Sequence, residues 1–139
     1  MARYGRRSMA NLEGVHPLLV DWALELVTIM DNKVVDGVRD LTTQQEYVAL
    51  GVSKTVDSKH LIQPDGYGHA LDLAPYPVDW SDHRRFYILA GVGLGLAAKM
   101  GLPIIWGGNW SQSDRFEIPD FNDLGHYQIM QDYTGATNG

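Results

Sequence analysis

Apolar residues recur at helical spacing early in the chain. Between positions 17 and 30 they lie three and four residues apart, which predicts a helix with one buried face. The apolar positions of this face are Leu19, Trp22, Leu26, Ile29 and Met30. A second helix is predicted over 42–50, because Thr42 and Gln45 have the spacing of a capping box and Gly51 can end the helix.

The longest periodic segment is predicted to be a helix from Asp79, a good N-cap residue, to about Met100. Its buried face is expected to contain Phe86, Leu89, Ala90, Gly93, Leu94 and Ala97. Three glycines inside it, Gly91, Gly93 and Gly95, each lower helix propensity by roughly 1 kcal/mol relative to alanine. We therefore expect them to allow close packing against a neighbouring element.

Short apolar runs between the helical segments predict strands. They cover about 34–38, with a turn at 36–37, and 70–74, 103–106 and 125–130. Helices that come first in the chain and last strands that lie in its second half indicate an α+β protein with a small, mostly antiparallel sheet and about three helices. We expect one domain over 1–139, with frayed termini at 1–11 and 132–139.

Composition narrows the functional classes. Hydrophobic residues make up 45% and charged residues 20% of the 139 positions, as in a soluble globular protein. The net charge of −6 argues against nucleic-acid binding, and no apolar run is long enough to insert in a membrane. The first residues are too polar for a signal peptide, so a cytoplasmic monomer is expected. With no cysteine, a metal must be held by His, Asp or Glu.

Two histidines and an aspartate are candidate metal ligands. His60 and Asp72 lie in the stretch SKHLIQPDGYGHALDL, and His126 follows Asp123 by three residues near the C-terminus. Two imidazoles and a carboxylate, with water in the fourth position, make a catalytic zinc site. A carboxylate such as Asp123 can act as general base beside it, with Asp120 and Glu117 as alternatives. Without a metal, these residues are a loop histidine, a capped carboxylate and a hydrogen-bonded strand histidine.

The motifs around these residues resemble those of a known superfamily. The segment SKH…GHALDL resembles the SxHxxGxAxD motif of the zinc D-alanyl-D-alanine carboxypeptidases, and IIWGGNW…NDLGHYQI resembles a block of their L-alanyl-D-glutamate peptidase branch, which includes phage endolysins. LEGVHPLLVDWALE and GVRDLTTQQEYVALGVSKT resemble the same branch. The resemblance spans about 12–128 and implies a fold like that of hedgehog and DD-peptidase domains.

The resemblance assigns roles residue by residue. It implies zinc as cofactor, with His60, Asp72 and His126 as ligands and Asp123 as catalytic base. Arg39 would steady the developing oxyanion; otherwise it is a solvated charge at the end of a strand, or it forms a salt bridge with Asp36 or Asp40. The residues expected to contact substrate are Ser58, Tyr67, Trp106 and Trp110, although Ser58 could instead bond the loop backbone and the aromatic residues could belong to the core.

The implied substrate is the stem peptide of peptidoglycan, cut at the L-Ala–D-Glu bond by an endolysin that waits in the infected cytoplasm until its release. Two alternatives remain, a D-alanyl-D-alanine carboxypeptidase or dipeptidase and a non-catalytic wall-binding module. The sequence departs from the motif in two places. Eleven residues separate His60 from Asp72, more than the motif has, and Asn109 stands where aspartate is common.

Overall fold

The computed structural model describes residues 1–51, 58–112 and 123–130. Within them the chain forms four helices and four strands, which confirms the α+β class. In chain order these are α1 (Arg6–Asn11), α2 (Pro17–Ile29), β1 (Asn32–Asp36), α3 (Leu41–Ala49), β2 (Ala70–Pro75), α4 (His83–Met100), β3 (Ile104–Trp106) and β4 (His126–Ile129).

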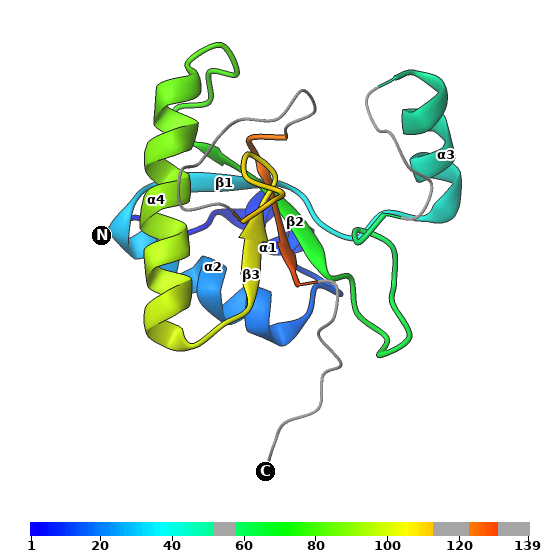
Figure 1. Cartoon of the computed structure of the whole chain (residues 1–139), viewed down its shortest axis with the longest axis horizontal. Helices are drawn as coiled ribbons and strands as arrows, with labels where there is room; N and C mark the ends of the chain where they lie inside the picture. The colour runs from blue at the N-terminus through cyan, green and yellow to red at the C-terminus, as the bar shows by residue number, and fades with distance from the viewer. Residues whose placement is uncertain (52–57, 113–122, 131–139) are drawn as a thin grey trace.

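The four strands form one antiparallel sheet in the order β1-β2-β4-β3. The last strand in the chain therefore lies between β2 and β3 in the middle of the sheet (Figure 1). Side chains alternate between the two faces of a strand. Leu71, Leu73, Tyr127 and Ile129 face the core, so residues between them in sequence face the opposite side. This opposite face carries Asp72 and His126.

Helices α2 and α4 pack together on the core face. The indole Nε1 of Trp22 donates a 2.8 Å hydrogen bond to the carbonyl of Gly93, and a Cβ at Gly93 would lie 2.9 Å from the same ring. The prediction that these glycines allow close packing is thus confirmed for Gly93. It is wrong for Gly91 and Gly95, whose Cβ positions meet nothing within 4 Å. Ile29, expected on the buried face of α2, is 57% exposed.

The predicted frayed N-terminus is wrong for α1, which lies along the free edge of β1. Ser8 is buried and its hydroxyl accepts a hydrogen bond from the backbone N–H of Val34. The Asn11 side chain donates to the carbonyl of Val34. Side chains of α1 therefore satisfy the outer backbone groups of an edge strand, which protects that edge from pairing with another chain. The expected frayed tail, 132–139, lies outside the described residues.

Two predicted helix starts are also wrong. Asp40, not Thr42, caps α3, because its carboxylate accepts a hydrogen bond from the backbone N–H of Thr43. Asp79 instead accepts bonds from Ser81 in a turn, and α4 begins only at His83. A local polar turn has replaced the first helical turn there. In the described part of the chain, no helix has the length and apolarity required to cross a membrane.

Candidate metal centre

Pairing of β2 with β4 creates the centre. Asp72 and His126 are direct partners across the two strands, so their side chains emerge side by side on the face away from the core. The register therefore places two of the three candidate ligands next to each other.

A tight turn brings His60 to the same place. The Ser58 hydroxyl accepts a hydrogen bond from the backbone N–H of His60, and the Ser58 carbonyl accepts one from Leu61. The carbonyl of His60 accepts a further bond from the backbone N–H of Arg39. His60 is almost fully buried, at 1% exposed. Ser58 therefore bonds the loop backbone, the alternative that its sequence context left open.

The three ligand atoms form a nearly regular triangle. His60 Nε2 lies 3.2 Å from both Asp72 Oδ1 and His126 Nδ1, and His126 Nδ1 lies 3.3 Å from Asp72 Oδ1. A tetrahedral zinc ion with bonds of about 2.0–2.1 Å spaces its ligands roughly 3.3–3.4 Å apart. The triangle matches one face of such a tetrahedron. Across the described residues, this is the one group of three that could hold a metal.

Hydrogen bonds fix the tautomer of both imidazoles. His60 Nδ1 lies 2.7 Å from the carbonyl of Gly37, which can only accept, so this nitrogen carries the proton. His126 Nε2 lies 2.8 Å from Gln128 Oε1 and donates to it in the same way. The unprotonated nitrogen of each ring then points into the triangle. Such outer partners orient metal-binding histidines and raise their basicity.

Arg39 is tied to the centre through Asp72. Its Nη2 donates to Asp72 Oδ2 at 3.2 Å, while Nη1 donates to Gln44 Oε1 at 2.9 Å and Nε donates to Asp36. The ion pair with Asp36, one of the two alternatives for Arg39, is thus present. Because Arg39 occupies Oδ2, the other oxygen of Asp72 is directed at the two histidines.

The electrostatics of the triangle favour a bound positive charge. Burial raises the pKa of Asp72, but the attraction of His60 and His126 outweighs burial and holds it well below its ordinary value. Burial lowers the pKa of His126, but hydrogen bonding and attraction to Asp72 raise it by more, so the net shift is upward. A cation held between these groups, whether a proton or a metal ion, is stabilised.

Asp123 is held beside the triangle by Gly107. The Gly107 backbone donates to the carbonyl of His126 at 2.7 Å and accepts from the N–H of Asp123 at 2.9 Å. A Cβ on Gly107 would lie 2.2 Å from the Asp123 carbonyl oxygen, so only glycine fits. Burial and repulsion from Asp72 raise the pKa of Asp123, and its carboxylate accepts a bond from the N–H of Gly125. The alternative bases Asp120 and Glu117 lie outside the described residues.

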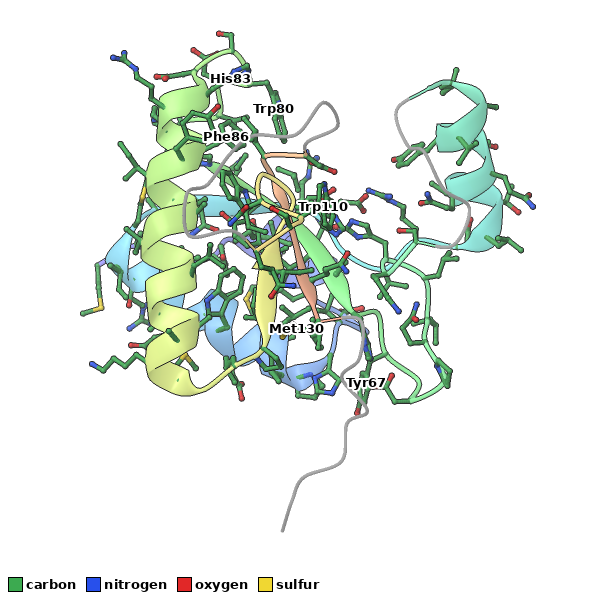
Figure 2. All side chains as sticks on the ribbon, viewed as in Figure 1. Tyr67, Trp80, His83, Phe86, Trp110 and Met130 are labelled. Atoms are coloured by element: carbon green, nitrogen blue, oxygen red, sulfur yellow. The ribbon has the colours of Figure 1, made fainter. Side chains whose placement is uncertain are left out.

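The predicted substrate aromatics take three different positions, two of which, those of Trp110 and Tyr67, are labelled in Figure 2. Trp110 packs against His126, with ring centroids 5.2 Å apart, and its buried Nε1 has no hydrogen-bond partner among the described residues. Trp106 is not brought to the ligands, because it lies in the core and donates to the carbonyl of Leu124. Tyr67 also lies away from Trp110, at 39% exposed, with its ring against His16.

The extra residues between His60 and Asp72 form a small hairpin. Gln63 donates to the carbonyl of Tyr67 at 2.8 Å, and Asp65 lies 2.7 Å from His69 Nε2 and 3.7 Å from His16 Nε2. These contacts hold the hairpin against His16, the residue that caps the start of α2. The insertion therefore leaves both ligands in place.

Gln128, Gly37 and Gln44 were not predicted from the sequence, although each orients a residue of the centre. The signal for Gln128 was its position two residues after His126, on the same face of β4. Gly37 and Gln44 act through contacts that depend on the fold, and no local pattern marks them.

Comparison with known proteins agrees with this geometry. The family model described as phage L-alanyl-D-glutamate peptidase matches residues 1–130. The crystal structure of the L-Ala D-Glu endopeptidase ChiX from Serratia marcescens is similar, with a TM-score of 0.73 and 29% identity, over 93% of this chain and 90% of that chain. Among curated proteins, none matches the chain. The chain therefore belongs to the phage L-alanyl-D-glutamate peptidase family and is a peptidase.

Proposed function

We propose that this chain is a zinc-dependent endopeptidase that cuts the L-Ala–D-Glu bond in the stem peptides of bacterial peptidoglycan. The observation that carries the proposal is the triangle of His60, Asp72 and His126, with edges of 3.2–3.3 Å and Asp123 beside it. Its family and the similar Serratia endopeptidase support the choice of bond.

The donor set suits zinc. Two neutral imidazoles and one carboxylate are borderline to hard ligands, and three protein ligands leave a fourth position for water or substrate. A zinc ion bound there supplies Lewis-acid polarisation of the scissile carbonyl and acidification of the attacking water. The fixed tautomers of His60 and His126 prepare the site for it.

Asp123 acts as the general base of this mechanism. It takes the proton of the attacking water and passes it to the leaving amine, as one carboxylate can do in both steps. A raised pKa fits both roles, because the group must release the proton as well as accept it.

Arg39 has two roles. It holds Asp72 in orientation through Oδ2, and it stabilises the negative charge that develops on the substrate oxygen. A guanidinium has five N–H donors, and the contacts with Asp36, Gln44 and Asp72 use three of them. The remaining donors serve the substrate. The Nε1 of Trp110, which has no partner within the described part of the chain, supplies a further donor beside His126.

The biological role we propose is bacterial lysis during phage release. The family description names phage peptidases, and cleavage of stem peptides removes the cross-linked connections that give the wall its strength.

Two variants test the assignment of roles. His60→Ala is expected to lose stoichiometric zinc and turnover of purified peptidoglycan. Asp123→Asn is expected to keep zinc and to lose turnover by about 10²–10⁴-fold, the usual contribution of a general base. Zinc content by elemental analysis and release of new amino groups give the two readouts.

The matched control is His83→Ala, because His83 is an exposed histidine at the start of α4. It is expected to keep both zinc and activity. Full activity of Asp123→Asn would move the base to Asp120 or Glu117, and full zinc content of His60→Ala would remove His60 from the ligand set.

A further inference from the structure

A second concave surface lies along the outer edge of β1, between α1 and the segment that follows β2. It encloses about 710 Å³, which is in the range of pockets that hold small ligands. Its charged side chains are Arg3, Arg6, Arg7, Lys33 and Asp31, and its exposed aromatic side chains are Tyr76 and Trp80. We refer to this surface as the basic groove.

The basic groove is unusual in this chain because of its charge. The protein has a net charge of −6, yet four cations and one carboxylate line this groove. In the part of the chain that the structure describes, none of the four cations forms an ion pair. Arg3, Arg6 and Arg7 line this concavity together with Lys33, and their positive charge is available to an anion.

One cation of the basic groove lies on the sheet face that carries the metal centre. Lys33 is paired with Ala74, which lies two residues beyond Asp72 on β2. Residues two apart on a strand face the same side and are about 7 Å apart, so Lys33 and Asp72 project from the same face. A chain bound at the centre reaches Lys33 after about two more extended residues.

Trp80 lines the basic groove and also approaches the turn that carries Asp123. Its ring stacks on Phe86, with centroids 5.2 Å apart, and Figure 2 shows both residues at the start of α4. A ring atom of Trp80 lies 3.6 Å from the position that a Cβ on Gly125 would occupy. Gly125 belongs to the turn that joins Asp123 to His126. A ligand lying against Trp80 is therefore next to the segment that carries the base.

We propose that the basic groove binds the carboxylate-bearing part of the stem peptide that continues beyond the cleaved bond. This inference rests on the proposed function. The stem beyond its L-Ala residue carries free carboxylates on successive residues, which match the unpaired cations. The exposed rings of Tyr76 and Trp80 supply apolar faces for the peptide chain between these carboxylates.

A short acidic peptide fits this surface better than nucleic acid does. A long polyanion is repelled by the net charge of −6 on the whole molecule. A short peptide instead responds mainly to charges within about 8 Å at physiological salt. Within that range the cations of the basic groove dominate.

The test compares two double variants with equal changes in net charge. Arg6→Gln/Lys33→Gln neutralises two cations of the basic groove, and Arg84→Gln/Lys99→Gln neutralises two exposed cations of α4 as a control. Each protein is given a synthetic stem peptide with free carboxylates and the same peptide with those carboxylates amidated. Cleavage kinetics and calorimetric binding are both measured.

The groove variant is expected to raise KM and the dissociation constant for the free-acid peptide about tenfold, with kcat nearly unchanged, as loss of two exposed ion pairs allows. The amidated peptide should not distinguish it from the control. Equal behaviour of the two variants, or equal losses on both peptides, would overturn the proposal. So would a single-stranded DNA oligomer that binds the wild type as tightly as the free-acid peptide.

The same experiment distinguishes failure of the proposed function from failure of the basic-groove proposal. If the wild-type zinc protein cuts neither peptide, the L-Ala–D-Glu assignment fails. The calorimetric comparison then still decides whether the basic groove binds the free-acid peptide, because binding requires no cleavage.

Discussion

At the scale of single residues, the centre depends on partners that never touch the metal position. Gly37 and Gln128 each hold one imidazole by its outer nitrogen, and Arg39 holds the outer oxygen of Asp72. Each candidate ligand thus has its outer nitrogen or oxygen held by a hydrogen bond, while its other nitrogen or oxygen points into the triangle. The ligands meet at zinc-like spacing because these outer bonds leave each of them one orientation.

Loss of the Gln128 side chain should weaken zinc binding. Gln128→Ala removes the acceptor for His126 Nε2, so the ring can turn or change tautomer, and we expect zinc affinity to fall by about 10–100-fold. Competition with a chromophoric chelator measures the change. Gln45→Ala, an exposed glutamine on α3, is the control. Unchanged zinc affinity in Gln128→Ala would show that the hydrogen bond does not orient the ligand.

At the scale of elements, the structure separates the three glycines of α4. Gly93 faces Trp22 of α2, whereas Gly91 and Gly95 are exposed and have open space around them. Only Gly93 is required for the close approach of α2 and α4. Replacement by alanine should therefore destabilise the protein at Gly93 and stabilise it at Gly91 and Gly95.

Alanine at each glycine tests this difference. Gly91→Ala and Gly95→Ala should each raise the free energy of unfolding by about 0.5–1 kcal/mol, because alanine is the better helix former. Gly93→Ala places a Cβ 2.9 Å from Trp22 and should lower it by about 1–3 kcal/mol through overpacking. Urea denaturation measures all three. Stabilisation by Gly93→Ala would contradict the packing described.

The sequence predicted the elements that carry their own periodic pattern and missed those that depend on contacts. Helix α2 and the antiparallel sheet were predicted because apolar spacing and turn residues are local signals. Helix α1 was missed because its six residues have little apolar pattern, and its place comes from bonds to the edge of β1.

The candidate site likewise has features that a local sequence pattern predicts and features that depend on contacts in the fold. His60, Asp72 and His126 could be predicted, because their residue types and motifs are local. The bonds from Arg39 to Asp72 and from His126 to Gln128 depend on strand register and on a loop conformation. Trp106 was misplaced because a tryptophan beside a glycine turn can face either side of a strand, and register places it in the core.

At the scale of the whole molecule, the metal centre connects segments that are distant in the chain. His60 follows α3, Asp72 lies on β2, and His126 lies on β4. Because the unfolded chain does not hold these residues together, a zinc ion held by all three would bind the folded state preferentially and stabilise it.

Zinc should therefore raise the melting temperature. At a free concentration about 100 times its dissociation constant, a ligand specific to the folded state adds about 2.7 kcal/mol to the free energy of unfolding. Calorimetry of the protein with chelator and then with added zinc measures this shift. His126→Ala should unfold at the same temperature in both conditions. A zinc-dependent shift that persists in His126→Ala would place the zinc elsewhere.

The most direct test of zinc-dependent cleavage between L-Ala and D-Glu is mass spectrometry of purified peptidoglycan after digestion. The account predicts released peptides with a new N-terminal D-Glu, absent when a chelator is present and restored by zinc. Release of terminal D-Ala instead would contradict the assigned bond and indicate a carboxypeptidase. Cleavage that is unchanged by complete removal of metal would contradict the role of the His60–Asp72–His126 centre.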